Sequence, residues 1–67
     1  MVIIEGLVVD KGDKWVLVRV NREVEMKVHH DGCLNCEVGS YVRLTCTVKR
    51  YKNKLVFLVV DGGGEDA

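Results

Sequence analysis

The chain has 67 residues and a mass of 7.5 kDa, which suits one small domain and excludes two independent hydrophobic cores. Its 10 lysines and arginines balance its 10 aspartates and glutamates, so no net charge attracts a polyanion. A hydrophobic content of 48% argues against disorder, and the longest apolar run, Leu55–Val60, is too short to span a membrane. Since Met1–Glu5 lacks the features of a signal peptide, we expect a cytoplasmic protein with no membrane partner.

The composition favours β-structure. There is no proline, and valine recurs at almost every second position of several segments. β-branched side chains suit a pleated surface better than a helix. Apolar residues at helical spacing do not continue over about ten residues anywhere in the chain. We therefore predict an all-β chain.

Turn residues divide the chain into five predicted strands. In chain order these cover residues 2–9, 14–20, 24–30, 41–51 and 54–61. The segments between them are Asp10–Asp13, Asn21–Glu23, the longer connection Asp31–Ser40, and Lys52–Asn53. One domain over residues 1–61 is expected, and residues 62–67, which have nothing to bury, are predicted to form a flexible acidic tail.

The register of the second and third strands follows from their alternation. A three-residue loop at Asn21–Glu23 gathers the apolar residues on one face, whereas a two-residue loop would mix the two faces. The predicted inward pairs are Val20 with Val24, Val18 with Met26, and Val16 with Val28. The predicted outward pairs are Arg19 with Glu25, Leu17 with Lys27, and Trp15 with His29.

The last two strands form a second predicted hairpin with Lys52–Asn53 at its tip. Val48 then faces Phe57 and Cys46 faces Val59, all on the inward side. Five short strands are too few for a two-sheet sandwich but enough for a small closed barrel without exposed edges. Gly6, in the middle of the first strand, is placed to supply the bend that closure needs.

This pattern resembles the OB-fold, a five-stranded Greek-key barrel. The resemblance rests on Gly6 within Glu5-Gly6-Leu7-Val8, on the meander of the first three strands, and on the fourth-strand entry Glu37–Val42. That entry is similar to the one in replication-protein-A-like and anticodon-binding barrels. The chain departs from the common pattern because Asp31–Ser40 has no room for the usual helix. The resemblance implies ligand binding on the face of the second and third strands, flanked by the loop between the first and second strands and the loop between the fourth and fifth strands.

The charges are unevenly placed. Residues 38–60 contain five basic side chains and no acidic one, and Tyr51 lies among them. Single-stranded nucleic acid is held by cations along its phosphates and by aromatic rings under its bases. The predicted nucleic-acid-binding residues are Trp15, Arg19, Lys27, Arg43, Lys49, Arg50, Tyr51, Lys52 and Lys54. Two plainer interpretations remain open: the basic tip is merely solvated, and Trp15 merely caps the core.

The segment from His29 to Cys36 is a second group of reactive side chains. Cys33 and Cys36 have the spacing of two zinc ligands, of a disulfide, or of two free thiols. Cys46 alternates with inward residues and suits the core better than a fourth ligand position. We predict no metal and no cofactor; His29, His30, Cys33 and Cys36 are the ligand candidates should one bind.

No Gly-X-Ser-X-Gly or phosphate-loop motif is present, and a barrel of this size has no deep cleft, so we do not expect an enzyme. The predicted function is a non-catalytic OB-type module that binds single-stranded DNA or RNA. The alternative is a protein-interaction barrel, a homodimer or part of a larger assembly. It would use the apolar outer faces of the first and fifth strands. The apolar residues concerned are Ile3, Leu7 and Val9 on the first strand and Val56, Leu58 and Val60 on the fifth.

Overall fold

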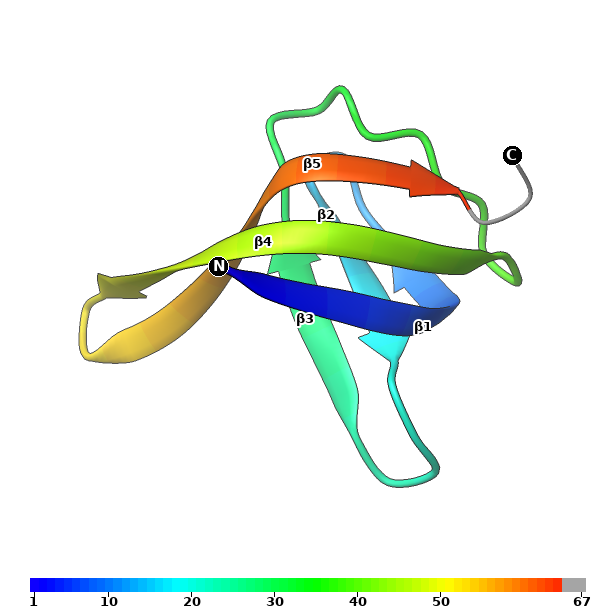
Figure 1. Ribbon diagram of the computed structural model, residues 1–67, viewed down its shortest axis with the longest axis horizontal. Coiled ribbons are helices and arrows are strands. Elements are labelled where there is room, and N and C mark those ends of the chain that lie inside the picture. The colour runs from blue at the N-terminus through cyan, green and yellow to red at the C-terminus, as the bar shows by residue number, and fades with distance from the viewer. Residues whose placement is uncertain (65–67) are drawn as a thin grey trace.

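Five β-strands close into a barrel in the computed structural model, which describes residues 1–64 of the chain. The strands are β1 (Val2–Lys11), β2 (Trp15–Arg19), β3 (Glu25–His29), β4 (Tyr41–Tyr51) and β5 (Lys54–Gly64). Neighbouring strands follow the order β1-β2-β3-β5-β4 around the barrel (Figure 1). The predicted all-β class and small five-stranded, OB-like barrel are therefore confirmed. Over residues 1–64, no helix is long and apolar enough to cross a membrane.

The core is built by the side chains that alternate inward along the strands. Alternation arises because successive side chains of a strand point to opposite faces of the sheet. Valine dominates the core, in keeping with its fit to a pleated surface. The buried hydrophobic residues are Ile4, Val8, Val16, Val18, Val28, Cys36, Val42, Leu44 and Cys46.

Strand β1 changes its pairing partner at Leu7. Residues 2–7 pair with β4, and residues 7–11 pair with β2. Gly6 lies just before this change, and a Cβ at Gly6 would overlap the carbonyl oxygen of Arg19. The two strands thus approach where only a glycine fits, which gives the predicted importance of Gly6 a steric basis.

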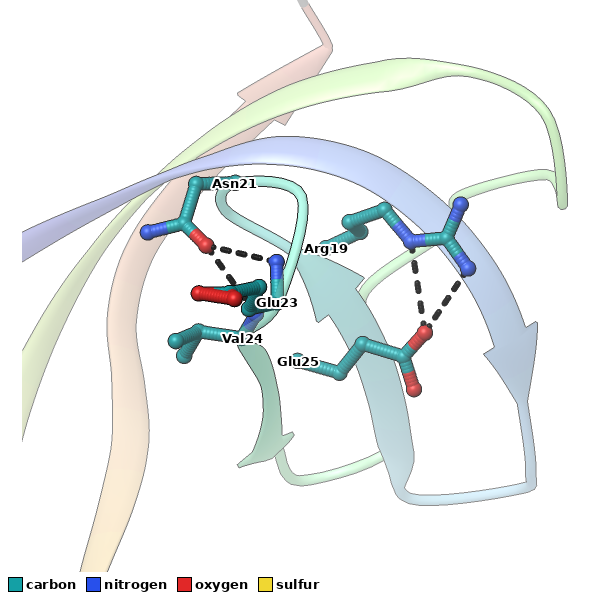
Figure 2. A network of polar contacts seen from close by, with 5 residues as sticks. All are labelled: Arg19, Asn21, Glu23, Val24 and Glu25. Carbon is teal, nitrogen blue, oxygen red and sulfur yellow. Dashed lines mark hydrogen bonds and ion pairs between the residues drawn. The ribbon is translucent and has the colours of Figure 1, made fainter.

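The register of the β2–β3 hairpin is the one predicted. Residues 15–19 pair with residues 29–25, from Trp15 with His29 to Arg19 with Glu25. Asn21 closes the loop, because its Oδ1 accepts hydrogen bonds from the N–H of Glu23 (2.9 Å) and of Val24 (3.0 Å), as Figure 2 shows. An asparagine that bonds the backbone two residues ahead stabilises this kind of turn.

The β4–β5 hairpin also has the predicted register, with Cys46 opposite Val59 and Val48 opposite Phe57. Lys52 and Asn53 both have positive φ (49° and 65°), as a two-residue type I′ turn requires. The hairpin projects beyond the other strands (Figure 1), because β1 pairs with β4 only as far as Cys46. Val48 is consequently exposed, and its predicted place in the core is wrong.

Several strand ends differ from the prediction. β1 continues to Lys11, whereas β2 and β3 are each one residue shorter at both ends. β5 continues to Gly64, and its Gly62–Gly64 pair with residues 44–42 of β4. β5 thus takes in the first three residues of the predicted tail, because backbone pairing needs no side chain to bury. The rest of that predicted tail, residues 65–67, lies outside the described residues.

The connection between β3 and β4 covers one end of the barrel. It forms no helix, as its length led us to expect, and Leu34 and Cys36 pack against the core. The Nζ of Lys11 donates a hydrogen bond to the carbonyl oxygen of Cys36 (2.9 Å). The backbone N–H of His30 donates a hydrogen bond to the carbonyl oxygen of Lys14 (2.9 Å). These contacts attach the connection to the end of β1 and the start of β2.

Candidate functional site

A row of outward side chains crosses the barrel from β2 to β4. Trp15 pairs with His29, His29 pairs with Leu58 in parallel, and Leu58 pairs with Thr47. Side chains of directly paired residues lie on the same face of a sheet. The register therefore places Trp15 on the same outer face as the β4–β5 hairpin.

A cavity of about 440 Å³ opens on this face at the base of the hairpin. Its lining residues are His29, Lys49, Arg50, Tyr51, Val56 and Leu58. Val56 and Leu58 are partly buried, whereas Lys49, Arg50 and Tyr51 are exposed. We call this cavity the hairpin pocket. It combines apolar surface, an aromatic ring and cations, and none of its lining residues is a carboxylate.

Four predicted cations lie on the β4–β5 hairpin: Lys49 and Arg50 line the hairpin pocket, and Lys52 and Lys54 lie at the turn of the same hairpin. All four are exposed, and none forms an ion pair within the residues that the structure describes. The Nζ of Lys52 lies 5.4 Å from the centroid of the Tyr51 ring. The exposed charges can meet an anion, and a planar group that stacks on this face of the Tyr51 ring has to displace Lys52.

Two other predicted cations already have carboxylate partners. Arg19 donates from Nε (3.3 Å) and Nη2 (2.9 Å) to Oε2 of Glu25, as drawn in Figure 2. The Nε of Arg43 lies 3.6 Å from Oε2 of Glu5, the residue of β1 with which Arg43 pairs. Arg43 is also about 20 Å along the strand from Lys49, at about 3.3 Å for each residue. The structure thus sets Arg19 and Arg43 apart from the hairpin cluster.

Trp15 is partly buried rather than fully open. A Cβ on Gly12 would overlap its indole, so the ring lies against the β1–β2 turn. The Nζ of Lys27 lies 4.5 Å from the ring centroid, in a cation–π contact. A base can stack on this face of the Trp15 ring only after Lys27 moves aside. The ammonium group of Lys27 is then available to a phosphate.

Three residues of the hairpin pocket are absent from the predicted nucleic-acid-binding residues. Val56 and Leu58 are predicted at a partner interface, and His29 is predicted beside Trp15 and among the metal-ligand candidates. The pairing of the β4–β5 hairpin indicates the place of Val56 and Leu58, because these outward residues of β5 lie opposite Lys49 and Thr47 of β4. No local signal existed for His29, which reaches the pocket through the parallel pairing of β3 with β5.

The His29–Cys36 segment is held by ordinary hydrogen bonds. The side chain of His30 is buried, and its Nδ1 accepts from the N–H of Gly32 (3.0 Å). The Oδ1 of Asp31 accepts from the N–H of Cys33 (2.9 Å), and this bond lowers the pKa of the Asp31 carboxyl group. Among the described residues, no three His, Cys, Asp or Glu side chains converge on a metal position.

The three cysteines are free thiols in different environments, which predicts selective labelling. Cys33 is exposed, whereas Cys36 and Cys46 are buried, and burial raises the pKa of both buried thiols. Because the thiolate is the nucleophile, we expect only Cys33 to react rapidly with iodoacetamide at pH 8 in the native protein. Mass spectrometry should show one fast modification, with the other two only in denaturant. Cys33→Ser should abolish the fast phase, and equal rates for all three thiols would contradict the burial.

Comparison with known proteins finds no family model that matches the chain. It also finds no significant match among curated proteins or solved structures.

Proposed function

We propose that this barrel is a non-catalytic module that binds single-stranded nucleic acid, DNA or RNA. The observation that carries the proposal is the hairpin pocket, which joins apolar residues and Tyr51 to Lys49 and Arg50, two cations without an ion pair among the described residues. An unpaired base is a flat apolar group attached to a phosphate, and the pocket offers a complement to both parts. In a duplex the bases are stacked and paired, so the pocket favours a single strand.

The expected affinity is modest and depends on salt. Stacking of one base on an aromatic side chain contributes about 1–3 kcal/mol. Four hairpin cations, Lys49, Arg50, Lys52 and Lys54, are available to neutralise phosphates. The chain as a whole carries no net charge to add long-range attraction. Binding is therefore expected at low ionic strength and should weaken steeply as salt displaces the phosphate contacts.

Removal of the Tyr51 ring tests the stacking part of the proposal. Tyr51→Ala is expected to weaken binding of short fluorescently labelled oligo(dT) and oligo(U) by about five- to hundredfold, measured by fluorescence anisotropy. Tyr51→Phe keeps the ring and is expected to bind nearly as the wild type does. Equal affinity of Tyr51→Ala and the wild type would remove the assigned role of the ring.

The phosphate part is tested by charge reversal in the same assay. Lys52→Glu should weaken binding of all single strands and reduce its salt dependence, because one phosphate contact is lost. The matched control is Arg22→Glu, which makes the same charge change at an exposed residue of the β2–β3 loop, outside the β4–β5 hairpin, and should have a smaller effect. Absence of binding at low salt would reject the proposed function as a whole.

A further inference from the structure

A second surface lies on the outer side of β1 and the first half of β4. It consists of three pairs in register, Ile3 with Thr45, Glu5 with Arg43, and Leu7 with Tyr41. We call it the β1–β4 face. Ile3 is 55% exposed, Leu7 39% and Tyr41 52%, so three large apolar side chains surround one ion pair. Clustered apolar exposure of this kind is typical of a surface that contacts another protein.

We propose that a second copy of this chain packs on the β1–β4 face about a twofold axis. The arrangement of charge on this face favours a second copy. Consider an axis parallel to the strands that passes between β1 and β4 in the plane of contact. Such an axis places each residue of β1 opposite the β4 residue with which it pairs within its own chain. Glu5 of one copy then faces Arg43 of the other, and the same contact is made a second time.

The same axis matches the apolar positions. Leu7 faces Tyr41 of the second copy, and Ile3 faces Thr45, so apolar side chains on each side of the ion pairs come together. Two sheets that pack face to face lie about 10 Å apart, a separation that side chains of this size fill. The face is therefore complementary to itself in both charge and polarity.

The ion pair also selects this axis over the perpendicular one. An axis across the strands would bring Glu5 opposite Glu5 and Arg43 opposite Arg43, and like charges in direct contact are unfavourable. No long-range repulsion opposes the association of two copies, because the chain has no net charge. This self-complementarity is the reason to assign the face to a second copy rather than to an unrelated protein.

The dimer is compatible with the hairpin pocket but does not depend on it. β4 contributes Tyr41–Thr45 to the β1–β4 face and Lys49–Tyr51 to the pocket, so the two surfaces share no residue. A dimer would carry two pockets, and two linked sites raise the apparent affinity for a long strand above that of one site.

Complementary charge reversals test the proposal. Glu5→Arg gives a chain with arginine at both positions, and Arg43→Glu gives one with glutamate at both. In sedimentation equilibrium we expect a wild-type dimer. Each variant alone should be monomeric, with a dissociation constant raised by about a hundredfold or more through like-charge contacts. An equimolar mixture of the two variants should form a heterodimer, because each arginine then meets a glutamate across the interface.

The controls separate this interface from general effects of charge. Glu23→Arg and Arg22→Glu make the same charge changes at exposed residues outside the face and should remain dimeric. Ile3→Lys removes an apolar contact without changing the ion pair and should be monomeric; circular dichroism checks that every variant is folded. A monomeric wild type at all accessible concentrations, dimeric single variants, or a mixture that stays monomeric would each overturn the proposal.

Discussion

Leu44→Ala is expected to unfold a large fraction of the protein at room temperature. Leu44 is a fully buried leucine in the middle of β4, paired with Ile4 on one side and Gly62 on the other. Truncation of a buried leucine costs about 2–5 kcal/mol, because apolar contacts are lost and a cavity remains. A single core in a domain of this size supplies about 3–5 kcal/mol in total. The expected loss is therefore comparable with the whole stability of the barrel.

The chain contains a matched control in Leu55. Leu55→Ala removes the same atoms from a side chain that is 63% exposed on the projecting part of the hairpin, whereas Leu44 is 0% exposed. We expect Leu55→Ala to change stability by no more than about 0.5 kcal/mol. Urea denaturation followed by circular dichroism measures both variants. Similar midpoints for the two would show that Leu44 is not at the centre of the core.

Gly6→Ala is expected to be the second most damaging change, although it adds only one methyl group. The added carbon would overlap the backbone carbonyl of Arg19, which cannot rotate away as a side chain does. Relief requires β1 and β2 to separate where Leu7 pairs with Arg19. Overpacking of this kind costs about 1–3 kcal/mol, and we expect the upper end. The melting temperature should fall by about 4–8 °C for each kcal/mol lost.

Gly39→Ala is the control for this prediction, because it isolates the conformational cost of replacing a glycine. Gly39 has a φ of +96°, and a methyl group there would meet no atom within 4 Å. Its cost is expected to be about 1–2 kcal/mol, from the unfavourable backbone conformation alone. A Gly6→Ala variant as stable as the wild type would show that β1 and β2 can separate without loss.

The candidate site was predictable from the sequence only where its residues are neighbours in one hairpin. Lys49 and Tyr51 precede the two-residue turn that contains Lys52, so the turn chemistry alone places the three residues together at the tip of the hairpin. Arg43 was grouped with them by a count of charges along the chain. The count could not show that Arg43 lies near the opposite end of an 11-residue strand, next to a carboxylate of β1.

Burial at the ends of the barrel was equally hard to predict. Val48 alternates with Cys46 and follows the pattern of a core residue, yet it is exposed, because β4 extends past the end of β1. Alternation determines the side of the ribbon on which a side chain lies. It does not determine whether another strand covers that side.

The amino-acid sequence alone determined the all-β class, the bounds of β4, and the registers of the β2–β3 and β4–β5 hairpins. These features depend on side-chain alternation and turn chemistry, which act between residues close together in the chain. Three other features are visible only in the folded chain: the parallel contact of β3 with β5, the change of partner within β1, and the Glu5–Arg43 pair. These features depend on how five strands close into one barrel. No single strand carries a local signal for a partner that is distant in the sequence.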